Sequence, residues 1–117
     1  MKKTMLGAQG EISFFAVDGS MPEGLVEHTE IDKLGRPIIS HSESGSHHVL
    51  ERAVKVFEKP NAPQGMRVFY ALLDQPTDLI QDASDAHGKH TLPAGLVEFR
   101  IAREFDPWTE QARQVAD

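Results

Sequence analysis

Five of the six histidines in this chain lie in two short segments whose residue types could bind a metal ion. The first segment, SHSESGSHH at residues 40–48, also contains Glu43. The five residues are His41, His47, His48, His87 and His90. Three imidazoles, or two imidazoles and a carboxylate, around an ion with an open coordination position are the usual arrangement of a catalytic zinc or a non-haem iron. If the two segments meet in the fold, these side chains could surround one zinc or iron ion.

The same stretch also suits a polar turn. Its remaining residues are mostly serine and glycine, and the histidine ring readily exchanges hydrogen bonds with hydroxyl and backbone groups. No spacing in the chain matches a specific metal signature such as the helical H-E-x-x-H. On a regular strand, His47 and His48 would point to opposite sides. We therefore expect a polar turn and no cofactor, with a histidine-rich metal-binding β-barrel, and a metal-dependent enzyme, as the alternative.

Two segments can be compared with the cupins, which are β-barrel proteins with histidine metal ligands. The segments GSHHVLER at 45–52 and LPAG at 92–95 are similar to the two cupin motifs, a glycine followed by H-x-H and glutamate, and a later P-x-G ahead of another histidine. Here adjacent histidines replace H-x-H, and no histidine follows LPAG. These differences remove the cupin ligand geometry. Because a G-x-S-x-G nucleophile elbow and a phosphate-binding loop are also absent, the sequence favours a protein without enzymatic activity.

The composition excludes several other classes of protein. The formal net charge is −6 and the lysines and arginines are scattered, which disfavours binding to nucleic acid or to anionic membrane surfaces. The longest apolar segment, VFYALL at 68–73, is too short to span a bilayer. Without cysteine, disulfide bonds and thiolate metal sites are impossible. We expect a protein that is made in a cytoplasm and that binds neither nucleic acid nor membranes.

Turn-forming residues recur at short intervals along the chain and predict an all-β fold. In LVEFRIARE, Val97, Phe99 and Ile101 share one face of a strand, and MRVFYALL at 66–73 is apolar on both faces, which is typical of a central strand. Other predicted strands are EISFFAV at 11–17, LVEHTEI at 25–31, RPIISHS at 36–42 and AVKVFEK at 53–59. About eight short strands predict a small antiparallel β-sandwich or barrel, similar to a jelly roll.

Only the end of the chain, residues 106–117, has a helical pattern. The Asp-Pro pair at 106–107 suits a helix start, and Trp108, Ala112 and Val115 would then share one face. We expect a short helix or turn there, with a frayed tail as the alternative. The length of 117 residues predicts one domain covering residues 1–117.

Three segments of the chain form a distinctive combination. They are HSESGSHHVLE at 41–51, LPAGLVEFRIAREFDP at 92–107 with the H-x-x-H that precedes it at 87–90, and RQVAD at 113–117. Together they match the pattern H-x-E-x-x-x-H-H, L-P-x-G, R-E-x-D-P and V-x-D, which resembles that of a group of short proteins from tailed phages and related prophages. No activity is established for this group, so the resemblance implies a phage origin and one β-rich domain and transfers no catalytic residue.

A small acidic β-sandwich without cysteine suits a phage capsid decoration or cement subunit. Such a protein stabilises the shell by protein–protein contacts, which need a rigid fold, contact area and free strand edges, but no active site. We expect the partner to be the major capsid protein or copies of the chain itself, and the location to be the virion after synthesis in the host cytoplasm. A metal-binding barrel and a phage-encoded modulator of a host protein are the alternatives.

The apolar residues that do not fit the predicted core are the expected contact residues. They lie in the N-terminal arm, in the first strand and in the turn after it. The set is Met1, Met5, Leu6, Phe15 and Met21. The alternative for each is that it covers one end of the barrel.

Overall fold

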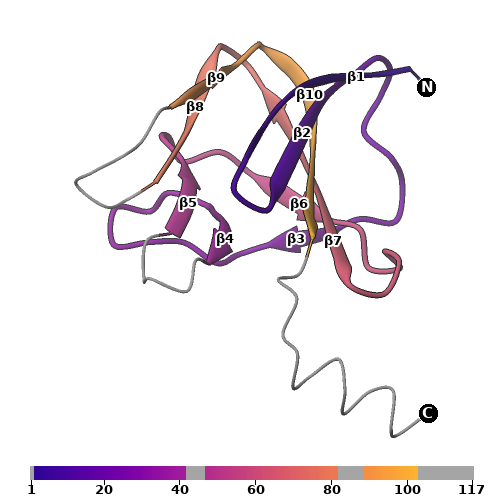
Figure 1. Cartoon of the computed structure of the whole chain (residues 1–117), viewed down its shortest axis with the longest axis horizontal. Helices are drawn as coiled ribbons and strands as arrows, with labels where there is room; N and C mark the ends of the chain where they lie inside the picture. The colour runs from indigo at the N-terminus through magenta and orange to yellow at the C-terminus, as the bar shows by residue number, and fades with distance from the viewer. Residues whose placement is uncertain (1, 42–46, 82–88, 103–117) are drawn as a thin grey trace, which may run out of the picture.

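The computed structural model describes residues 2–41, 47–81 and 89–102, and within these ranges the chain forms ten β-strands and no helix. The fold is all-β and antiparallel, as the spacing of turn residues predicted (Figure 1). The strands are β1 (Lys3–Gln9), β2 (Ile12–Val17), β3 (Val26–His28), β4 (Ile38–His41), β5 (His47–Leu50), β6 (Val56–Glu58), β7 (Met66–Leu73), β8 (Thr77–Gln81), β9 (His90–Leu92) and β10 (Gly95–Ala102). The helix predicted for residues 106–117 lies outside the described residues.

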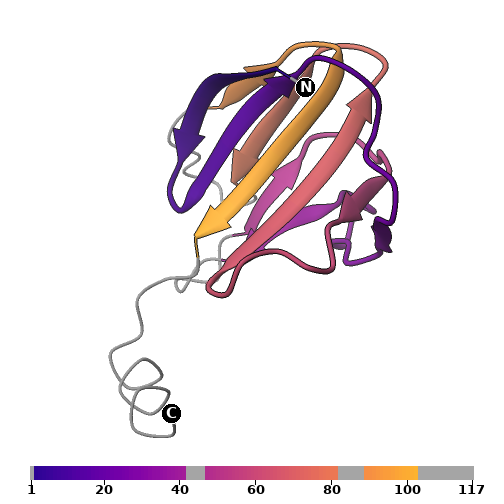
Figure 2. The same cartoon turned by 90° about the vertical axis from the view of Figure 1, so that its right-hand side faces the viewer.

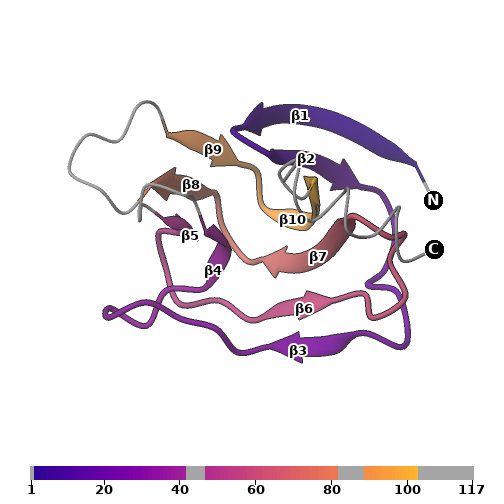
Figure 3. The same cartoon turned by 60° about the horizontal axis from the view of Figure 1, so that its bottom comes forward.

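The strands form two sheets that face each other (Figure 2). The larger sheet has six strands in the order β1-β2-β10-β7-β6-β3, and the smaller has four in the order β4-β5-β8-β9. Figure 3 shows β1 and β3 at the two borders of the larger sheet, with the smaller sheet beside its inner face. The fold is therefore a β-sandwich whose longest strands, β7 and β10, are central.

The main core lies between the sheets. Phe14, Phe69 and Phe99 are directly opposite one another on β2, β7 and β10, and each is at most 1% exposed. The same cluster includes Leu50 and Leu79 of the smaller sheet. The predicted inward face of β10, with Val97, Phe99 and Ile101, is confirmed.

The outer face of the larger sheet carries a second, smaller core. Val68, Tyr70 and Leu96 are buried there, and residues from the segments 18–25 and 59–66 pack over them. This cover explains why MRVFYALL is apolar on both faces, as expected for a central strand. Leu72 is the exception, because it is 63% exposed.

The first residues of the chain, which the sequence analysis assigned to an N-terminal arm, form an edge strand. β1 pairs with β2 through a tight turn at Gly10, whose φ of +58° suits the first position of a type II′ hairpin. The sequence KTMLGAQ lacks a regular alternation of apolar and polar residues, so its strand character was missed. A β-bulge between Met5 and Gly7 further interrupts the pattern by leaving Leu6 without a partner residue on β2.

Candidate functional site

The structure brings two of the candidate histidines together at the end of the smaller sheet. His41 of β4 and His47 of β5 are directly opposite in the antiparallel pair, and their Nδ1 atoms are 3.0 Å apart. The ring planes meet at 85° with centroids 4.4 Å apart. Glu30 Oε2 lies 2.7 Å from His41 Nε2, on the other side of that ring. We call the two histidines the His41–His47 pair, and Glu30 is the carboxylate that contacts His41 of this pair.

His48 lies on the opposite side of β5, as the alternation of side chains on a strand predicts. It is buried, and its Nδ1 donates a hydrogen bond to Gln9 Oε1 at 2.6 Å. Gln9 Nε2 in turn donates to the carbonyl of Leu79 at 3.3 Å, and Glu11 Oε2 lies 3.9 Å from His48 Nε2. His48 therefore helps to fasten the β1–β2 hairpin to the smaller sheet.

The two remaining described histidines have structural contacts of their own. His90 packs the edge of its ring against Phe14, with centroids 5.1 Å apart. His28 Nε2 donates to the carbonyl of Ile38 at 2.7 Å, and the His28 ring packs against Phe69. Within residues 2–41, 47–81 and 89–102, no three His, Asp or Glu side chains are arranged to hold a metal ion. His87 and Glu43 lie outside the described residues.

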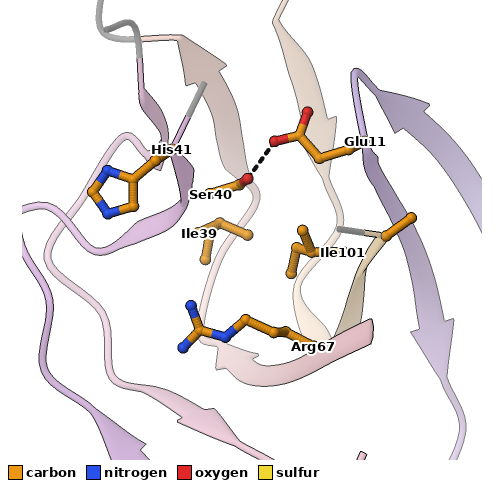
Figure 4. Close-up of a pocket in the computed structure, with 7 residues that line it drawn as sticks. Glu11, Ile39, Ser40, His41, Arg67 and Ile101 are labelled. Carbon is orange, nitrogen blue, oxygen red and sulfur yellow. Dashed lines mark hydrogen bonds between the residues drawn. The ribbon is translucent and has the colours of Figure 1, made fainter. Parts of the chain in front are cut away.

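A small open cleft of about 260 Å³ lies beside Ser40 and His41 of β4 (Figure 4). Glu11 and Arg67 face it from opposite sides, with Ile39 and Ile101 between them. The hydroxyl of Ser40 donates to the Glu11 carboxylate. Ser40 is therefore paired with a carboxylate at the wall of the cleft.

Arg67 is held at the wall of the cleft by two other contacts. Its Nε and Nη2 atoms donate to the two carboxylate oxygens of Glu58 at 2.9 and 2.8 Å. Its guanidinium lies 4.8 Å from the ring centroid of Phe69. This bidentate ion pair raises the pKa of Arg67 above its ordinary value and fixes its planar group between β6 and β7. Arg67 therefore contributes to the sandwich structure, and its geometry does not identify a substrate.

Sequence reasoning missed a buried carboxylate on the outer face of the larger sheet. Glu98 is 1% exposed and accepts a hydrogen bond from Tyr70 at 2.6 Å and one from Arg100 Nε at 2.6 Å. Lys3 Nζ of β1 lies 2.8 Å from Glu98 Oε1. Burial alone would raise the pKa of this carboxyl group, but the three donors outweigh burial and lower it. Burial and the contact with Glu98 raise the pKa of Tyr70.

The four predicted contact residues that the structure describes fall into three groups. Met5 and Leu6 of β1 are 61% and 38% exposed at the border of the larger sheet. Phe15 lies beside Met5 on the outer face, where the guanidinium of Arg100 covers its ring at 4.5 Å. Met21 is partly buried against the outer core. Met1 lies outside the described residues.

Comparisons with known proteins add no homologue. A scan against protein-family models found no matching family, and searches of curated proteins and of solved structures found no match. Among the described residues there is also no helix with the length and apolar character needed to cross a bilayer.

Proposed function

We propose that this chain is a structural component of a tailed-phage virion, a capsid decoration subunit that stabilises the shell through protein–protein contacts. The observation that supports this best is the position of β1. It borders the larger sheet, and it presents Met5 and Leu6 to solvent. The sequence resemblance to short tailed-phage proteins supports a phage origin, and the proposed partner is the major capsid protein. Contacts between copies of the chain are the alternative.

The expected mode of binding is strand addition to β1. Among the described residues, β1 pairs with β2 only, so its outer backbone groups can accept a strand from a neighbouring sheet. The apolar side chains would be buried in the same contact. Fully burying a methionine or leucine side chain is worth about 1.5–3 kcal/mol, so the exposed parts of Met5 and Leu6 would contribute roughly 0.9–1.8 and 0.6–1.1 kcal/mol.

The contacts around β1 hold it in a binding-competent conformation. Lys3 is attached to Glu98 near the start of the strand, and Gln9 is attached to His48 and Leu79 at its end. A strand that is already ordered does not lose backbone entropy when it binds, which leaves more of the contact energy for affinity.

The proposal is tested by adding the chain back to shells of the encoding phage that lack it. We expect the double variant Met5→Ser, Leu6→Ser to bind the shells at least tenfold more weakly than the wild type, because about 2 kcal/mol of apolar burial is lost. The matched control is Leu34→Ser. Leu34 is 73% exposed in the segment between β3 and β4, across the sheet from β1, and its replacement is expected to leave binding unchanged.

Copy number distinguishes this function from its alternatives. Quantitative mass spectrometry of purified virions is expected to find the chain in many copies, in a fixed ratio to the major capsid protein. A chain that is absent from virions but recovered with one host protein would contradict the proposal and favour a host-directed modulator. Equal shell binding by wild type and the double variant would contradict the role of β1.

A further inference from the structure

We propose that the His41–His47 pair is a binding site for a single divalent late transition-metal ion such as Cu²⁺, Ni²⁺ or Zn²⁺. This inference concerns the smaller sheet and does not depend on the proposed virion function. It also differs from the metal site considered from the sequence, because His48 and His90 take no part. His48 points to the other side of β5, and His90 lies against Phe14.

The distance between the two possible ligand atoms suits the coordination of one ion. Imidazole nitrogens lie about 2.0–2.1 Å from such an ion, so two Nδ1 atoms that are 3.0 Å apart can reach the same ion after a small movement of the rings. Imidazole is a common ligand of zinc, copper and nickel, and among these the general affinity order places Cu²⁺ above Zn²⁺.

The position of Glu30 also favours metal binding by His41. Its carboxylate is 2.7 Å from His41 Nε2 and accepts the proton of that nitrogen, which leaves the Nδ1 lone pair of His41 directed at His47. Metal-binding histidines commonly donate their second nitrogen to a carboxylate in this way, which fixes the ring and increases its basicity. Binding the ion also requires the Nδ1 atom of His47 to give up its proton, because only a deprotonated ring nitrogen can coordinate a metal.

The His41–His47 pair lies at the surface, where an ion can approach it. The side chains of His41 and Glu30 are 47% and 45% exposed, so an ion can reach the pair from solvent. The described residues supply two imidazole ligands at this position, and the exposure of the pair leaves room for water ligands. Because His41 and His47 are opposite each other on β4 and β5, the ion would also link these two strands.

Isothermal titration of the untagged, full-length chain with NiCl₂, after dialysis against a chelator, tests the site. We expect one ion per chain, and we expect His41→Ala and His47→Ala each to weaken binding at least tenfold. Glu30→Gln is expected to weaken it about tenfold, as is usual for the partner of a metal-binding histidine. The control His90→Ala removes a histidine outside the pair and is expected to leave the nickel affinity unchanged.

A second measurement locates the ion in the wild-type protein and does not depend on the folding of any variant. Substoichiometric Cu²⁺ is expected to broaden the backbone amide NMR signals of β4 and β5 around His41 and His47 before those of β9. The absence of both heat and broadening would overturn the proposal, since the pair would then be an ordinary hydrogen bond between rings. Binding that persists in His41→Ala and His47→Ala, or broadening centred on His90, would also overturn it.

Discussion

Replacing Glu98 by glutamine tests whether its carboxylate stabilises the larger sheet. Glu98 accepts charge-assisted contacts from Lys3, Tyr70 and Arg100 while it is almost completely buried. Hydrogen bonds to charged groups contribute about 1.5–3 kcal/mol each, against about 1 kcal/mol for neutral ones. A glutamine also offers one acceptor oxygen in place of two.

The expected loss of stability is smaller than the sum of these hydrogen-bond contributions, because solvent partly compensates the partners of Glu98. Lys3 and Arg100 are 33% and 38% exposed, so each regains hydration when the negative charge is removed. We therefore expect Glu98→Gln to lower the free energy of unfolding by about 2–3 kcal/mol at neutral pH, and to lower Tm by roughly 8–12 °C for a chain of this size. Urea denaturation and thermal unfolding measure both quantities.

The pH dependence of this loss identifies the charge as its cause. The pKa of Glu98 is lower in the folded protein than in the unfolded chain, so its charge stabilises the fold above the unfolded value of about 4.3. That stabilisation is lost as the pH falls through the folded pKa. The stability difference between wild type and Glu98→Gln is therefore expected to be largest near neutral pH and to shrink below about pH 4.

The control is Glu27→Gln. Glu27 is an exposed glutamate on β3, the border strand opposite β1, and its replacement is expected to change stability by less than about 0.5 kcal/mol. A Glu98→Gln protein as stable as the wild type would refute the reasoning. A difference that stays constant from neutral to acidic pH would show that packing, and not charge, makes Glu98 important.

Two further substitutions test how tightly β1 is packed. Gly7→Ala would place a methyl group 3.2 Å from the buried ring of Phe14, and we expect thermal unfolding to show a loss of about 1–2 kcal/mol, whereas an unchanged Tm would show that the ring can move aside. His48→Leu removes the proton that Gln9 Oε1 accepts inside the protein, and we expect urea denaturation to show a loss of about 1–3 kcal/mol. A His48→Leu protein as stable as the wild type would contradict this explanation.

The sequence patterns identified the strands that are covered on one face or on both. In β10, Val97, Phe99 and Ile101 alternate with polar residues, and that alternation predicted the inner face correctly. The same alternation made Glu98 look like an exposed polar residue. Its burial depends on Lys3 and Tyr70, which are remote in the sequence, so a local pattern could not predict it.

Edge strands are harder to predict for a physical reason. A border strand has fewer neighbouring strands, so solvent reaches its side chains on both faces. Its sequence therefore does not need to alternate apolar and polar residues. In β1, the five residues from Lys3 to Gly7 are at least partly exposed, and the bulge at Leu6 shifts the alternation by one position. The histidines show the converse, since the strand period alone predicted that His47 and His48 point to opposite sides.

The two ends of β1 explain how an exposed strand remains ordered in this protein. Lys3 holds it from the outer face through Glu98, and Gln9 holds it from the inner side through His48. Neither contact uses the middle of the strand, where Met5 and Leu6 are exposed. If the residues before Gly7 formed a free arm, binding would have to order each of them at a cost of about 1–2 kcal/mol per residue. Because β1 is fixed at both ends, the entropy cost of ordering it belongs to folding and not to binding. A rigid edge strand can therefore bind through a small number of apolar side chains.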